Sequence, residues 1–199
     1  MGVRPLDESE RHLTEAISLY GESGGPSSPV HAMKALSRTY LSGGNAIGAI
    51  RQLIAALALY RELRSPMGEV LALAHLAEAR QANGQPAEAA AAAEEAVAIA
   101  VSIDTPFPTG FALSALAVVH QGAGRLAAAA DCLTRAVDAF RYNSERWAGK
   151  ALLALGDVRH AQGDPDAARA AWQDASRTLH MITHPDAADA DARLGAGAH

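Results

Sequence analysis

The 199-residue chain is poor in aromatic residues and holds only one cysteine. Aromatic residues make up 5% of it, and runs of β-branched residues are few, so we expect no β-sheet core. Because Cys132 is alone, no intrachain disulfide can form, and a cytoplasmic location is the simplest expectation. The default role for Cys132, which lies among alanines, is that of a small buried filler.

Several other features are also missing. No uncharged apolar run reaches the roughly 18 residues of a membrane span. The first five residues lack the apolar core of a secretory signal. A net charge of −5 argues against nonspecific nucleic-acid binding. Neither a phosphate-binding Gly-x-x-x-x-Gly-Lys-Ser/Thr loop nor a His-Glu-x-x-His zinc motif is present. We therefore expect no membrane or direct nucleic-acid contact, no cofactor, no metal, no catalytic residues and no enzymatic activity.

What the chain does have is alanine at a regular spacing. The spacing is 40, 40, 40 and 39 residues for one set of five alanines: Ala16, Ala56, Ala96, Ala136 and Ala175. Four glycines follow the same period: Gly44, Gly84, Gly124 and Gly163. A period of this length is typical of a solenoid in which one helix pair repeats. Since alanine is also the strongest helix former, the sequence predicts an all-α solenoid of antiparallel helix pairs.

The glycines mark the turn inside each helix pair. Asn83-Gly84 ends one amphipathic segment with a residue that tolerates a left-handed backbone, and Pro86 suits the first turn of the next helix. This pattern predicts one repeat domain over residues 1–199 with about nine helices. Its parts are a half-repeat helix at 6–20, helix pairs at 30–66, 67–106, 107–145 and 146–183, and a partial or capping helix at 186–199. The half-repeats suggest a longer parent protein or a homodimer formed through the exposed repeat ends.

These positions resemble the tetratricopeptide repeat (TPR) family. The family's Leu-small pair is matched in four copies: Leu36-Ser37, Leu76-Ala77, Leu116-Ala117 and Leu155-Gly156. Each pair is followed by the turn glycine and by two in-register positions that are alanine in all four copies. The period of 40 is longer than the usual 34 and is shared by HEAT and armadillo repeats, but the agreement of all four copies favours the TPR. The resemblance implies a right-handed superhelix.

The segment Ala58-Leu59-Tyr60-Arg61-Glu62-Leu63, followed by Gly68-Glu69, is similar to the TPR arrays of large bacterial transcriptional regulators. These include Streptomyces antibiotic regulatory proteins and MalT-like, LuxR-type regulators. The resemblance implies that this chain is the regulatory or sensor part of such a protein. Other domains of the same parent chain would then bind DNA and nucleotide.

In the TPR family the first helix of each pair lines an inner groove. Carried over by position, the resemblance implies the following groove residues: His31, Lys34, Arg38, Leu71, Ala74, Glu78, Gln81, Phe111, Ser114, Val118, Gln121, Lys150, Leu153, Asp157 and His160. Such a groove is basic at its N-terminal end, apolar in the middle and mixed at its C-terminal end. It would suit a protein or peptide with an acidic end and an apolar centre.

Three alternatives remain open. The same positions could be ordinary solvated helix faces. Phe111, Val118 and Leu153 could instead hold a small molecule or a signalling peptide inside the superhelix. The half-repeats could make the chain a self-associating scaffold.

Three histidines are the weakest candidates for a functional site. His180 and His184 are four residues apart with Asp186 nearby, a spacing that could hold a metal, although a helix end before Pro185 is the simpler interpretation. His120 stands where the family places a packing aromatic, so we expect a core or half-buried histidine there.

Overall fold

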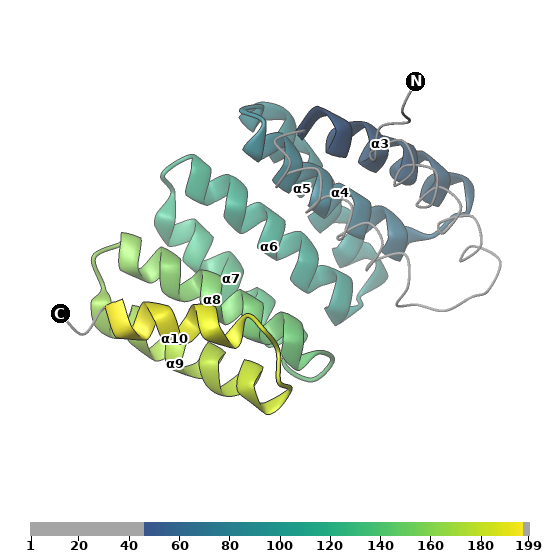
Figure 1. Cartoon of the computed structure of the whole chain (residues 1–199). Helices are drawn as coiled ribbons and strands as arrows, with labels where there is room; N and C mark the ends of the chain where they lie inside the picture. Colours follow the sequence, from purple (N-terminus) through teal and green to yellow (C-terminus); the bar gives the residue numbers. More distant parts are fainter. Residues whose placement is uncertain (1–45, 197–199) are drawn as a thin grey trace, which may run out of the picture. The chain divides into compact units, whose positions relative to one another are not determined.

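The computed structural model describes residues 46–196, and every regular element in that range is an α-helix (Figure 1). Eight helices are present there, close to the nine expected for the whole chain. The predicted helix at 6–20 and the first helix of the 30–66 pair lie outside the described residues. The chain divides into two compact units, Met1–Ile103 and Asp104–His199, and each is described separately.

Unit 1 contains three described helices: α3 (Ala46–Glu62), α4 (Pro66–Ala82) and α5 (Pro86–Ile103). α4 packs against both of the others. Its interior side carries Val70, Leu73 and Leu76, which are at most 2% exposed. α5 contributes only alanines to the core: Ala89, Ala92, Ala93, Ala96 and Ala100. With such small side chains, the core of this pair requires close approach of the two helices.

Unit 2 contains five helices: α6 (Pro106–Gly122), α7 (Leu126–Phe140), α8 (Glu145–Ala161), α9 (Pro165–Met181) and α10 (Ala187–Ala196). Each helix packs against the next along the chain. All three phenylalanines of the chain meet near the start of α6 and the end of α7, where Phe111 and Phe140 lie 5.2 Å apart between ring centroids. Trp147 of α8 joins them at 4.6 Å from Phe111. This aromatic cluster ties α6, α7 and α8 together.

The glycine turns inside the pairs are confirmed for three of the four predicted glycines, and the fourth, Gly44, lies outside the described residues. Gly84, Gly124 and Gly163 have φ of 73°, 72° and 78°, in the left-handed region that glycine enters without strain. The turns between pairs differ from the prediction by one residue. Pro66 and Pro106 were assigned to the ends of the preceding pairs, but each is the first residue of a helix. The first turn needs no N–H from its first residue, and proline's fixed φ suits it.

Large and small residues are matched across the helix pairs. A Cβ added to Gly110 of α6 would lie 2.5 Å from the ring of Phe140, and one added to Gly149 of α8 would lie 2.6 Å from Leu179. Likewise, a Cβ at Gly156 would lie 2.3 Å from Trp172. These glycines let a large side chain of the second helix lie directly on the backbone of the first. Gly156 is the small residue of the Leu155-Gly156 pair, so at this repeat position the small residue is where the two helices come close together.

Candidate binding surface on the first helices

The predicted groove positions are on α4 of unit 1 and on α6 and α8 of unit 2, which are the first helices of their pairs, and the two units are described separately. We use the name first-helix face for the groove positions predicted on these three helices. In unit 1 these are Leu71, Ala74, Glu78 and Gln81. Ala74 was expected to line the groove, but it is only 1% exposed. Leu71 is buried, with 3% exposure. Glu78 is half-buried and its carboxylate lies 3.4 Å from Nδ1 of His75. Gln81 is also half-buried, and within residues 46–196 no hydrogen-bond partner reaches its buried Oε1. In this unit the N-terminal part of the face is therefore buried, and its C-terminal part carries half-buried polar side chains.

On α6 the structure corrects one prediction. Phe111 was expected to point into the groove, but it is only 5% exposed because it packs among Phe107, Phe140 and Trp147. The next predicted position, Ser114, donates a 2.8 Å hydrogen bond to the carbonyl of Gly110 in its own helix. The last two positions are more open: Val118 is half-buried and Gln121 is exposed. Among the predicted positions on α6, the accessible ones are therefore in its C-terminal half.

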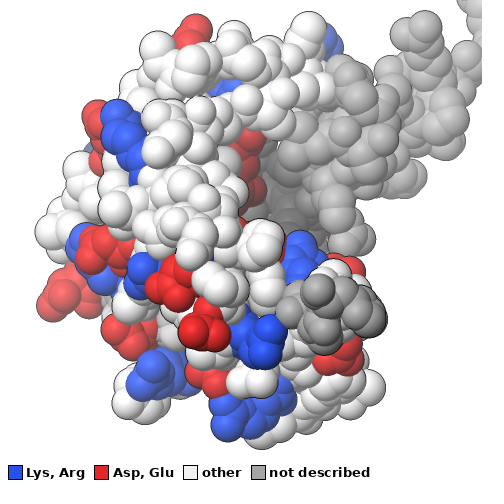
Figure 2. Space-filling model, turned by 90° about the vertical axis from the view of Figure 1, so that its left-hand side faces the viewer, with Lys and Arg blue, Asp and Glu red and all other residues white. Residues whose placement is uncertain are grey.

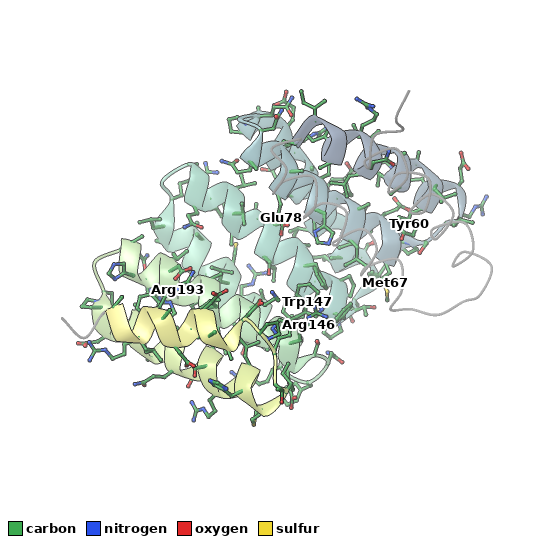
Figure 3. All side chains as sticks on the ribbon, in the orientation of Figure 1. Tyr60, Met67, Glu78, Arg146, Trp147 and Arg193 are labelled. Carbon is green, nitrogen blue, oxygen red and sulfur yellow. The ribbon has the colours of Figure 1, made fainter. Side chains whose placement is uncertain are left out.

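On α8 the two predicted charges are already paired with the segment at α10. Lys150 forms an ion pair with Asp186, which directly precedes α10. Asp157 accepts two hydrogen bonds from Arg193 of α10, at 2.6 and 3.0 Å, and a third from Nε1 of Trp172 at 3.1 Å. The hydrogen bonds from Arg193 to Asp157 raise the pKa of the arginine further. Figure 3 labels Arg193 on the yellow helix beside α8.

His160 is the exposed member of the set on α8, with its ring 5.7 Å from that of Trp172. Gln81, Gln121 and His160 occupy the same repeat position, 40 and 39 residues apart. Each side chain lies near the C-terminal end of its helix, and two of the three are exposed. The open part of the first-helix face therefore carries side chains that can both donate and accept hydrogen bonds. The remaining predicted position on α8, Leu153, is half-buried. The predicted groove residues that precede α4, which are His31, Lys34 and Arg38, lie outside the described residues.

The groups singled out for other chemistry have ordinary partners. His180 lies 2.9 Å from Asp191, and His184 lies 3.5 Å from Asp186. Within residues 46–196, no three His, Cys, Asp or Glu side chains come together in an arrangement that could hold a metal. His120 is half-buried, as expected, and lies 3.1 Å from Nε of Arg125.

Cys132 is buried, as predicted for a filler residue. Burial raises the pKa of its thiol, and neighbouring Asp131 adds to that effect. A raised pKa keeps the side chain as the less reactive thiol. Nothing at this position therefore supports a catalytic cysteine.

Sequence reasoning missed a shallow cavity in unit 2. Its volume is about 320 Å³, and it is lined by α7, α8 and α9, with Val137, Leu152 and Met181 among its apolar residues. Arg141 and Arg177 also line the cavity. Arg141, which directly follows α7, pairs with Asp138 of α7, and Arg177 pairs with Asp174 of α9. Because these residues come from three different helices, no single periodic position of the sequence marked the cavity.

Charges are mixed on the face drawn in Figure 2, where acidic and basic residues are interspersed and neither sign forms a continuous patch.

At the start of α8, a cation lies against an aromatic ring: the guanidinium of Arg146 is 5.5 Å from the ring centre of Trp147 (Figure 3). Within residues 46–196, no helix combines the length and apolar character that crossing a bilayer requires.

Comparison with known proteins supports the repeat assignment. Residues 108–180, which run from α6 into α9, match the family model of the tetratricopeptide repeat. No curated protein matches the chain. Among solved structures, BtubC (BKLC) from P. vanneervenii is similar with a TM-score of 0.72 at 18% identity, over 98% of this chain and 84% of that one.

Two further structures are similar at low identity. One is a signal transduction ATPase with numerous domains (STAND) from Pyrococcus horikoshii that has a tetratricopeptide repeat sensor. It matches with a TM-score of 0.68 at 14% identity, over 95% of this chain and 28% of that one. The other is a Rap protein complexed with Competence and Sporulation Factor, with a TM-score of 0.55 at 15% identity, over 97% and 59% of the two chains. At these identities the likeness establishes the fold: the chain has the all-α, TPR-like solenoid fold, and residues 108–180 carry the family's sequence pattern.

Proposed function

We propose that this chain is a noncatalytic module that binds a protein or a peptide along its first-helix face. The observation that carries the proposal is the open C-terminal part of that face, where Gln121 and His160 recur at one repeat position and are exposed. A peptide backbone offers both N–H donors and carbonyl acceptors, and amide and imidazole side chains can pair with either. The tetratricopeptide repeat match and the likeness to a Rap protein complexed with a factor add support.

The rest of the predicted face contributes in different ways. In unit 2, Ser114 and Val118 are half-buried and would flank the bound segment. In unit 1, Glu78 and Gln81 are half-buried polar residues that would contribute contacts of their own. His31, Lys34 and Arg38 remain part of the proposal as its basic end. Phe111 does not, because its side chain is in the aromatic cluster. Its burial also removes the main apolar group that motivated a small-molecule sensor.

We further infer that the module is the regulatory or sensor part of a larger bacterial transcriptional regulator working in the cytoplasm. The STAND neighbour supports this inference, since that protein carries a tetratricopeptide repeat sensor and this chain covers 28% of its length. In such an arrangement the bound segment could belong to another protein or to another domain of the parent chain.

The binding proposal can be tested by selecting peptides from a random phage-displayed library on the purified chain. The variant Gln121→Lys/His160→Glu changes two exposed positions of the face, and Ala127→Glu changes an exposed position of α7 as a matched control. We expect one or more enriched peptide families whose binding is lost in the double variant and kept in the control. If no family is enriched, or if the double variant binds as well as the wild type, the proposal is wrong.

A further inference from the structure

α10 packs on α9, and charged and polar contacts also join the α10 segment to α8 and α9. Lys150 of α8 pairs with Asp186, and Asp157 of α8 pairs with Arg193. A third contact joins α9 to α10, where Asp191 accepts a 2.7 Å hydrogen bond from Ser176 and lies 2.9 Å from His180. The side chains of the first two pairs are 24–37% exposed, so water and salt reach them.

The apolar contribution of α10 is small by comparison. Its buried residues are two alanines, Ala187 and Ala190. α8 buries Trp147 and Val158, and α9 buries Trp172 and Leu179. Because hydrophobic stabilisation scales with the apolar area removed from water, α10 gains much less from docking than the other helices do. Partly exposed ion pairs add little to this. α10 is therefore expected to open locally at a lower free energy than α8 or α9.

The charges on the two segments are in register. Lys150 and Asp157 are seven residues apart on α8, and Asp186 and Arg193 are seven residues apart at α10. Seven residues are about two helical turns, or roughly 10 Å along the axis. The pairs join Lys150 to Asp186 and Asp157 to Arg193, so both segments run in the same direction. The surface is thus matched to a helix with an acidic residue followed, two turns later, by an arginine.

We propose that the α8 face defined by Lys150 and Asp157 is an exchangeable docking site for a partner helix with an acidic residue and an arginine seven positions apart, and that α10 is its resident occupant. This inference rests on the proposed function, because both residues belong to the first-helix face. A partner helix with the same charges and larger apolar residues than alanine would displace α10 by burying more apolar surface. The partner is then selected by charge spacing, and binding is coupled to release of α10.

Hydrogen–deuterium exchange on the full chain tests whether α10 is releasable. We expect amides of residues 187–196 to exchange faster than those of α8 and α9 by about 100-fold, which corresponds to an opening free energy lower by about 3 kcal/mol. The difference should widen in about 1 M NaCl, where screening acts over only a few ångströms. Equal protection of α10, α8 and α9 in low and high salt would overturn the proposal.

A fluorescent, covalently stapled helical peptide of residues 184–196 tests whether the vacated face binds such a helix. The full-chain variant Asp186→Lys/Arg193→Glu should release the resident α10. We expect this variant to bind the peptide about tenfold or more tightly than the wild type, because an internal competitor lowers apparent affinity. Adding Lys150→Glu/Asp157→Arg should abolish peptide binding and restore α10 protection, since the internal pairs are complementary again.

The remaining outcomes also decide the question. If the peptide binds the released and wild-type chains equally, or binds the fourfold variant as well, the charge spacing does not select the occupant. If the wild type forms concentration-dependent dimers that Asp186→Lys/Arg193→Glu abolishes, the occupant is α10 of a second copy and the partner-helix proposal is wrong. Peptides selected in the library experiment that still bind after all of these changes would preserve the proposed function and overturn this inference alone.

Discussion

The α4–α5 pair of unit 1 and the α6–α7 pair of unit 2 share one repeat but fill it in opposite ways. Val70 and Ala100 of the first pair occupy the positions of Gly110 and Phe140 in the second, 40 residues later. Val70, Ala100 and Phe140 are all at most 1% exposed. In the α4–α5 pair the larger residue, Val70, is on α4. In the α6–α7 pair the larger residue, Phe140, is on α7. A Cβ at Gly110 would lie 2.5 Å from the Phe140 ring, so the two arrangements cannot be mixed at one site.

This comparison shows that the repeat conserves filled volume and leaves the choice of side chain open. Protein interiors are close-packed, so a large residue at one of two facing positions requires a small one at the other. The third pair follows the second: Gly149 of α8 lies under Leu179 of α9, where an added Cβ would be 2.6 Å from Leu179. The aromatic cluster of unit 2 is one consequence, because glycine at position 110 gives Phe140 room to reach Phe111.

The strongest test transplants one arrangement into the other. Phe140→Ala should cost about 4 kcal/mol by leaving a cavity, and Gly110→Val should cost about 3 kcal/mol by overpacking. The double variant rebuilds the Val70/Ala100 arrangement, so its cost should fall short of the sum by about 1–3 kcal/mol. Urea unfolding of the four proteins measures this. Additive costs would break the comparison, because they would mean that the two positions do not share one volume.

A smaller effect is expected from alanine at the same glycine. Gly110→Ala should cost about 2 kcal/mol, since its single methyl group must displace the Phe140 ring. The matched control is Gly195→Ala in α10, where an added Cβ meets nothing within 4 Å. Helix propensity should make the control neutral or more stable by about 0.5–1 kcal/mol. Opposite signs of the two changes in thermal or urea unfolding would sharpen the comparison, and equal losses would contradict it.

The turns extend the comparison from the core to the backbone. Turns within pairs place glycine at positive φ, whereas Arg64 and Asp104, which lead into the next pairs, have φ of 49° and 45°. Gly84→Ala should cost about 1 kcal/mol, and Arg64→Gly should stabilise unit 1 by somewhat less than that. Asp104→Gly should gain less than Arg64→Gly, because aspartate tolerates the left-handed region better. Denaturant midpoints measure all three, and a loss on Arg64→Gly would count against a strained turn.

Tyr60 offers a spectroscopic test at the position equivalent to Ala100 and Phe140. It is 6% exposed, and burial raises the pKa of its phenol to about 12. The neutral phenol is favoured in the folded chain, so its contribution to stability is complete below about pH 10 and is lost as the pH rises toward about 12. Ultraviolet titration should show a late tyrosinate transition that Tyr60→Phe removes. A wild-type titration in which all tyrosines ionise together near pH 10 would show that Tyr60 is not packed.

Much of the fold could be predicted from the sequence because its signals are local. Alanine content and glycine spacing predicted helix pairs, and Gly84, Gly124 and Gly163 are in the left-handed conformation that a helix-ending turn requires. Boundaries were less certain, as shown by Pro66 and Pro106, which begin helices that the prediction started one residue later. A proline is compatible with either side of such a boundary, so the sequence alone left its placement open.

The candidate site was predicted less well than the fold. Periodicity identified which residues share a repeat position, but it could not indicate which neighbours would cover them. Phe111 is buried by its neighbours in the aromatic cluster, whereas Gln121 and His160 are exposed. A pairing of Gly110 with Phe140, 30 residues apart, was the signal in the sequence that could have revealed the cluster.

The sequence by itself determined the helical class, the 40-residue period and the left-handed glycine turns, because each depends on residues close together in the chain. Only the tertiary structure decided that Lys150 forms an ion pair with Asp186 and that Asp157 forms one with Arg193. Those partners are 36 residues away, and whether they meet depends on how a whole helix packs against its neighbours. For the same reason, the choice between Val70 with Ala100 and Gly110 with Phe140 becomes intelligible only when both helices of each pair are in place.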